Sequence, residues 1–188
     1  MSTVKTPSVH TERPPSAKLV GTIPSVAGLS VQEFGVGSVR QTLLTFSSFR
    51  VTLTDNGVTH AGGAKIYDFP AGLVHVKGIT GSLTIASSEA TSANHVCSIG
   101  SVVGNTSANG TLTSTEADLV ASTAAAIASS AGTFNAKSTA ALMAANVFDG
   151  TSTALGAYLN AAGGADDVGG TRDFTGTILI TWENFGDI

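Results

Sequence analysis

The chain contains 188 residues, a length that suits a single domain with one hydrophobic core. Half of the residues are Ala, Gly, Ser or Thr, 12% are charged, and the formal net charge is −4. This composition lacks the basic patch that nucleic-acid binding requires, and no stretch approaches the roughly 18 apolar residues of a membrane-spanning helix, so we expect neither nucleic acid nor a membrane as a partner.

Residues 1–15 lack the apolar core of a secretion signal, which predicts synthesis and retention in the cytoplasm. Cys97 is the only cysteine, so an intramolecular disulfide is impossible and the fold must be held together by packing. We interpret Cys97 as a small buried apolar residue and not as a reactive thiol.

Residues 1–24 contain four of the five prolines, with basic and hydroxyl residues between them. Each proline fixes φ and removes a backbone donor, so we predict an extended N-terminal arm; the alternative is a disordered leader. Because ordering an arm costs about 1–2 kcal/mol per residue in backbone entropy, we expect it to bind its own body, a sister subunit or another protein. The candidate contact residues in the arm are His10, Arg13, Pro14, Pro15, Lys18 and Leu19.

The glycines at positions 35 and 37 predict a bend, which is followed by the longest strand signal, residues 40–54. Leu44 and Phe46 occupy even positions before Ser47, whereas Phe49, Val51 and Leu53 occupy odd positions after Ser48. A β-bulge at these two serines restores a single buried face. The Asp-Asn-Gly sequence at 55–57 then predicts a hairpin turn.

Shorter strand signals follow along the chain, separated by Pro70 to Gly72, by Gly78 and by turn-rich stretches. Ile79, Leu83 and Ile85 alternate with hydroxyl residues, which is typical of a strand with one buried face. The further strands are predicted at residues 65–69, 73–77, 79–85, 96–103, 133–139 and 154–162.

Residues 113–131 leave two alternatives open. The sequence Thr-Ser-Thr-Glu at 113–116 matches a capping box, and the Ala-rich run behind it favours a helix. The thin apolar stripe and the many Ser and Thr residues argue against one.

The end of the chain has the clearest pattern of all. Ile178, Ile180 and Trp182 share one parity, whereas Thr177 and Thr181 take the other, which predicts a half-buried strand. Trp182 is the only tryptophan, and burying it removes about 150–250 Å² from water, so we expect a core strand. In all, about eight short strands separated by turns predict an all-β fold, a β-sandwich or jelly roll spanning residues 25–188.

The sequence offers no catalytic or metal-binding motif. The four histidines are far apart, and the aspartates at 166, 167 and 173 lack the spacing of a calcium loop. The glycine-rich stretches at 35–40 and 62–65 do not match a nucleotide-binding loop, and Ser152 lacks the glycine of a nucleophile elbow. We therefore expect no enzyme, no cofactor and no metal site.

Two C-terminal segments carry a family resemblance: residues 148–160 (FDGTSTALGAYLN) and 176–187 (GTILITWENFGD), with residues 115–118 (TEAD) in support. They resemble the C-terminal part of small virion structural proteins of tailed bacteriophages, of the type that decorates or cements the head. The resemblance covers about a third of the chain and implies a β-rich protein that binds the major capsid protein on the capsid surface after synthesis in the host cytoplasm.

Such a protein needs a rigid body and many copies, and pairing of exposed strand edges leads us to expect a homo-oligomer, a dimer or a trimer. The alternative is a tail- or fibre-associated adaptor or a glycan-binding β-sandwich. Tyr67, Tyr158 and Trp182 are the aromatic residues with polar edges that a sugar would use, although Trp182 is predicted to lie in the core.

Overall fold

The structure, a computed structural model, describes residues 26–35, 37–55, 59–91, 95–104, 112–125, 129–145, 147–150, 155–163 and 170–186. Ten strands dominate the described residues, with one short α-helix and one turn of 3₁₀ helix. The elements are β1 (Leu29–Phe34), β2 (Val39–Asp55), β3 (His60–Asp68), β4 (Leu73–Thr91), β5 (His95–Gly100), η1 (Ser114–Glu116), β6 (Val120–Ala125), β7 (Ser129–Lys137), α1 (Ala140–Ala145), β8 (Val147–Asp149), β9 (Gly156–Gly163) and β10 (Gly170–Asn184).

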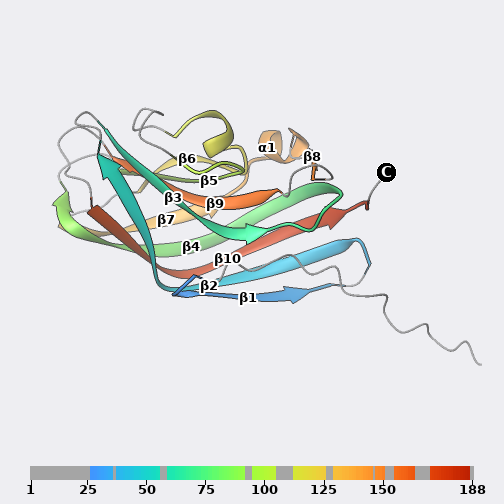
Figure 1. The fold of residues 1–188 in the computed structure, drawn as a ribbon, viewed down its shortest axis with the longest axis horizontal. Helices are drawn as coiled ribbons and strands as arrows, with labels where there is room; N and C mark the ends of the chain where they lie inside the picture. Colours follow the sequence, from blue (N-terminus) through green and yellow to red (C-terminus); the bar gives the residue numbers. More distant parts are fainter. Residues whose placement is uncertain are drawn as a thin grey trace, which may run out of the picture.

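The strands form one antiparallel sheet in the order β6-β5-β9-β3-β2-β10-β4-β7, with β1 added to β2 and β8 added to β4. Among the described residues, two halves of this sheet are joined by strand pairing only where the end of β2 pairs with the start of β3, at Thr54↔Ala61 and Asp55↔His60. The sheet curls, so that its first and last strands, β6 and β7, contact each other (Figure 1). The predicted all-β class is confirmed, while the sandwich or jelly-roll form stays a prediction.

We call the two parts the β10 half (β1, β2, β10, β4, β7 and β8) and the β9 half (β3, β9, β5 and β6). One apolar cluster lies between them and takes residues from both, such as Phe49 and Ile178 from the β10 half and Ile99 and Leu159 from the β9 half. All four side chains are fully buried, so the core holds the curl of the sheet closed.

The predicted change of phase in β2 is confirmed. Phe46 lies opposite Gly176 and Phe49 lies opposite Phe174, so Ser47 and Ser48 together face only one residue of β10. Ser48 adopts a φ of 52°, and its N–H donates to the Thr175 hydroxyl over 3.1 Å. The β-bulge thus returns the apolar residues of β2 to one face.

The closing strand β10 is a core strand, as predicted. It lies between β2 and β4 and pairs with both along almost its whole length. Ile178, Ile180 and Trp182 are completely buried, and Trp182 packs edge-on against Phe69 at 5.6 Å between ring centroids. Its indole N–H donates to the buried hydroxyl of Thr42 over 2.8 Å.

Three local expectations need correction or completion. Gly78 does not separate two strands, because β4 continues through it with only a register irregularity against Thr181 and Trp182. The alternative of a helix fails over the described residues 113–125 and 129–131: Thr113 makes no side-chain capping bond, and the strand β6 follows a single 3₁₀ turn because Leu119 and Val120 are buried in the core. The short helix α1 was not foreseen.

Other expectations fall on residues outside those described. The arm at 1–24, with its six candidate contact residues, the Asn-Gly turn at 56–57 and the acidic loop around 166 belong to this group. In the described part of the chain, no helix has the length and hydropathy that would let it cross a membrane.

Candidate interaction surface

The side of the β10 half that faces away from the core is covered by small polar side chains; we call it the outer face. Its central row runs across five strands, with directly opposed residues in the sheet register. All five side chains of the row are exposed: Ser30 (β1), Thr45 (β2), Thr177 (β10), Ser82 (β4) and Asn135 (β7). Neighbouring strands lie about 4.8 Å apart, so this row presents hydroxyl and amide groups over roughly 20 Å.

Hydroxyl residues continue on either side of the central row. Thr175, Thr84 and Thr133 oppose one another on β10, β4 and β7, and all three are exposed. Ser82 donates to the Asn135 side chain over 2.9 Å, and Thr84 donates to the Thr175 carbonyl over 3.1 Å. These bonds hold part of the array in fixed orientations and leave other hydroxyl lone pairs directed at solvent.

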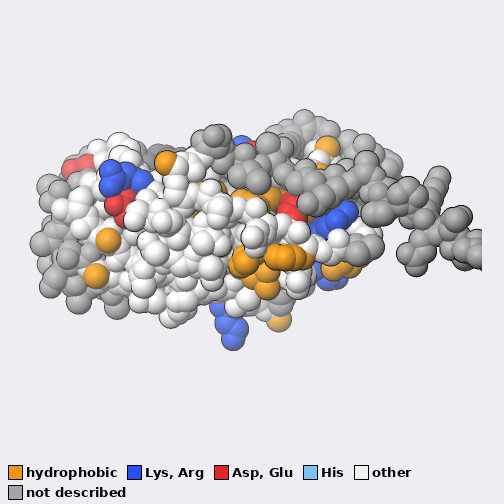
Figure 2. Space-filling model, turned by 90° about the horizontal axis from the view of Figure 1, so that it is seen from below, with side chains coloured by type: hydrophobic (Ala, Val, Ile, Leu, Met, Phe, Trp, Pro, Cys, Tyr) orange, Lys and Arg blue, Asp and Glu red, His pale blue; other side chains and the backbone are white. Residues whose placement is uncertain are grey.

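Charged side chains lie toward the ends of the outer face. At one end the Arg50 guanidinium binds both carboxylate oxygens of Asp173, each over 2.8 Å, and this hydrogen bonding lowers the pKa of Asp173. At the other end the Lys77 ammonium nitrogen lies 3.5 Å from a carboxylate oxygen of Glu183. Figure 2, seen from below Figure 1, shows a broad field of polar and backbone atoms with few charged side chains, which gather toward its margins.

An apolar patch adjoins the hydroxyl array toward the Lys77 end. Leu43 and Leu179 oppose each other on β2 and β10 and are half-buried. Phe34 lies diagonally across from Leu43 and is 49% exposed, and Val39 is 46% exposed. We define these four residues as the apolar patch, which is consistent with the hydrophobic side chains gathered in one part of the face in Figure 2.

The outside of the β9 half is different, because residues 102–104 and the turn η1 lie against it. Asn160 on β9 is completely buried there: its Oδ1 accepts from the Gly104 N–H over 2.8 Å, and its Nδ2 donates to the carbonyls of Val102 and Glu116 over 3.0 and 2.8 Å. Ser98 donates to the same Glu116 carbonyl over 2.7 Å. This polar cluster ties the segments around β5 and η1 to the sheet and is structural.

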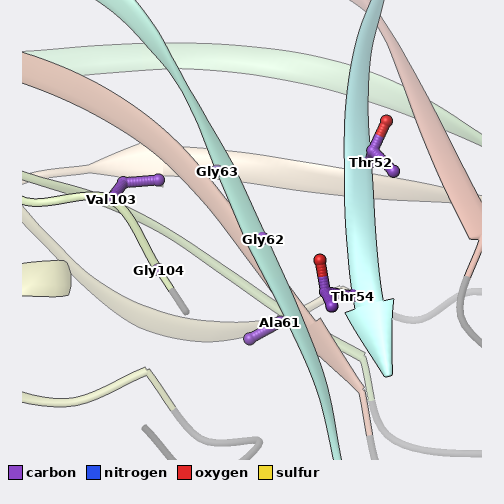
Figure 3. A pocket seen from close by; sticks show the side chains of 7 residues that line it. All are labelled: Thr52, Thr54, Ala61, Gly62, Gly63, Val103 and Gly104. Carbon is purple, nitrogen blue, oxygen red and sulfur yellow. The ribbon is translucent and has the colours of Figure 1, made fainter. Parts of the chain in front are cut away.

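A pocket of about 250 Å³ lies where β2 and β3 diverge. Figure 3 shows the side chains of Thr52 and Thr54 on the β2 side and Val103 on the other side of the β3 backbone. The lining residues are Thr52, Thr54, Ala61, Gly62, Gly63, Val103 and Gly104. This lining has two hydroxyls and no ionisable side chain, so it offers no general acid or base.

The described residues assemble no metal-binding cluster. They contain no group of three or more His, Cys, Asp or Glu side chains placed to hold a metal ion. Cys97 is buried, as predicted, and burial raises the pKa of its thiol to about 12, which makes it unreactive. His60 is buried with its Nδ1 at 3.2 Å from an Asp55 carboxylate oxygen.

The aromatic residues considered for sugar stacking do not meet in a site. Tyr67 and Trp182 are completely buried and contact each other in the core at 6.2 Å between centroids. Tyr158 is half-buried, and the Lys65 ammonium lies 5.5 Å from its ring centroid. The outer face was not foreseen as a site. Ser30, Gln32 and Phe34 are exposed and alternate with half-buried residues, and this alternation could have indicated the edge of the face.

Comparison of the chain with models of known protein families, with curated proteins and with solved structures found no match.

Proposed function

We propose that this protein is a virion structural protein of a tailed bacteriophage, a capsid decoration (cement) protein that binds the shell of the major capsid protein and stabilises it. The proposal assigns the chain no catalytic role, cofactor or metal. It acts on the capsid surface in several copies, as a homo-oligomer, after synthesis in the host cytoplasm.

The observation that carries the proposal is the outer face. It is a broad, exposed surface with few charges, in which donors and acceptors lie beside the apolar patch. The centres of protein interfaces are likewise depleted of charged residues, whereas small-molecule sites are concave. A broad five-stranded face therefore favours a protein surface as its partner.

Copy number explains how such a face can be effective. Hydroxyl groups exchange hydrogen bonds with water for hydrogen bonds with protein at a small net gain of about 0.5–1.5 kcal/mol each. One copy then binds its shell modestly, but copies joined to each other act at high effective concentration. The resemblance of residues 148–160 and 176–187 to phage head proteins adds support from the sequence.

Co-sedimentation with phage heads that lack this protein tests the proposal. We expect saturable binding of the full chain and at least roughly tenfold weaker binding of Thr177→Arg, because a large cation then stands in the middle of the hydroxyl row. Thr123→Arg is the matched control, since Thr123 is an exposed threonine on β6 in the β9 half. It is expected to bind like the unchanged chain.

A chain without residues 1–24 tests the arm in the same assay. We expect its circular dichroism spectrum to keep the β signature while binding to heads is lost or strongly reduced. Binding of the full chain to purified tails but not to heads would transfer the proposal to a tail adaptor. Binding to neither would remove it.

A further inference from the structure

Among the described residues, β1 is an edge strand of the sheet. β1 pairs with β2 from Leu29↔Phe46 to Phe34↔Gln41, and among the described residues no strand pairs with its other side. β1 (LSVQEF) contains no lysine, arginine or proline, the residues that natural proteins place on edges to prevent pairing. Its one charged side chain, Glu33, is half-buried and hydrogen-bonded to the Tyr67 hydroxyl, so it does not guard the edge.

The backbone N–H and C=O groups of Val31 point toward the edge of the sheet that β1 forms. The Ser47 N–H donates to the Gly28 carbonyl over 2.8 Å, which fixes the phase of the ladder between β1 and β2. In an antiparallel ladder every second residue bonds to the same neighbour. The backbone groups of Ser30 and Gln32 therefore face β2, and those of Val31 face away from it.

We propose that a second copy of this chain pairs with this edge, β1 against β1 in antiparallel orientation, about a two-fold axis through Val31. This inference rests on the proposed function in one respect: both require several copies of the chain. Residues of β1 whose numbers sum to 62 then lie opposite each other, which places side chains of the same face together, as pairing requires. Val31 meets Val31 of the second copy, and the two half-buried side chains cover one another.

Packing and charge both suit this register. Phe34, 49% exposed on the outer face, comes to lie opposite Gly28 of the second copy, where no side chain obstructs its ring. Glu33 lies opposite Leu29 of the second copy, so no like charges meet. A pairing centred on Gln32 would require Gly35, with a φ of +116°, to hydrogen-bond to Leu29 of the second copy. In the register centred on Val31, Gly28 also has a positive φ, of +83°, but it makes no hydrogen bond to the second copy because its backbone faces β2.

The pairing joins the two outer faces into one continuous surface. The overlap extends over one short strand from each copy, well below the roughly 1,600 Å² of a standard protein interface. We therefore expect a dissociation constant on the order of micromolar. On a shell, the doubled surface binds with the avidity that one copy lacks.

Cysteine cross-linking of the full-length chain tests the register. In hydrogen-bonded antiparallel pairs the Cα atoms lie about 5.5 Å apart, within the range of a disulfide, so Val31→Cys is expected to form a covalent dimer under mild oxidation. Gln32→Cys is the matched control on the same strand. Its counterpart in the second copy lies diagonally, about 7–8 Å away, and should cross-link poorly. Buried Cys97 keeps the background low in both variants.

Sedimentation equilibrium supplies a second, independent readout. We expect the unchanged chain to be in monomer–dimer equilibrium and Val31→Pro to be monomeric with an unchanged circular dichroism spectrum, because proline removes an N–H that faces away from β2. A monomeric unchanged chain, or dimerisation unaffected by Val31→Pro, would overturn the inference, as would cross-linking through position 32 and not 31. Dimers that fail to bind phage heads would contradict the proposed binding to the capsid alone. Monomers that bind heads would contradict this inference and the proposed homo-oligomer, and would leave the proposed binding to the capsid intact.

Discussion

At the scale of single residues, the bond between Trp182 and Thr42 is a polar contact inside the core. The indole N–H is buried with its partner hydroxyl at 2.8 Å, and both side chains have no exposed surface. Thr42→Val keeps the shape and removes the acceptor, so the N–H is left unsatisfied and the free energy of unfolding falls by about 1–3 kcal/mol.

Chemical denaturation monitored by the fluorescence of Trp182, the only tryptophan, measures this loss. Thr45→Val is the control, because Thr45 lies on the same strand with its side chain exposed, and we expect its free energy of unfolding to change by less than about 0.5 kcal/mol. Equal stability of the two variants would show that another group, or water, satisfies the indole.

At the scale of elements, the bulge between β2 and β10 depends on Gly176. Its φ is +142°, and a Cβ at this position would lie 2.3 Å from the Ser82 carbonyl oxygen of β4. The clash is with backbone in the middle of the sheet and cannot be relieved by a side-chain rotation. Gly176→Ala is therefore expected to lower the free energy of unfolding by at least about 2–3 kcal/mol.

Gly37→Ala separates the steric effect from the backbone effect. Gly37 also has a positive φ, of +75°, but a Cβ there would meet no atom within 4 Å. The expected loss is about 1 kcal/mol, the cost of the left-handed conformation alone. Thermal or urea unfolding of the two variants measures the difference, and equal losses would mean that the β4 backbone moves aside.

The elements also show how far the sequence determines the fold. The phase change at Ser47 and Ser48 was predictable because burial of one face leaves a period of two in the local sequence. Gly78 was misread because a glycine at a strand irregularity looks the same in sequence as a glycine at a break. At Thr113 the capping pattern was outweighed by burial of Leu119 and Val120 in the core, which is a tertiary effect.

The site was less predictable than the fold. The outer face is assembled from five strands, and which residues become neighbours depends on registers that no local pattern contains. The same holds for Asn160, whose bonding partners Val102 and Glu116 are 58 and 44 residues away along the chain. The periodicity of a strand shows on which face of the sheet a residue lies, but it does not show which residue lies opposite it on the adjacent strand.

At the scale of the whole molecule, β10 makes the sheet indivisible. It lies between β2 and β4, and it supplies Phe174, Ile178, Ile180 and Trp182 to the core shared by both halves. A chain ending at residue 173 loses all four side chains and leaves the facing edges of two long strands without their common partner. We expect no soluble, folded monomer from this chain, because exposed apolar strand edges aggregate.

Removal of residues 185–188 is the control for this truncation. Phe185 follows β10 and is 51% exposed, so its loss removes little buried surface, and a soluble product with the β spectrum of the full chain is expected. Gel filtration measures whether each truncated chain is a soluble monomer, and circular dichroism measures whether it keeps the β spectrum. A soluble, folded monomer ending at residue 173 would mean that β2 and β4 can close on each other, and that β10 completes the surface of this protein without being needed for its core.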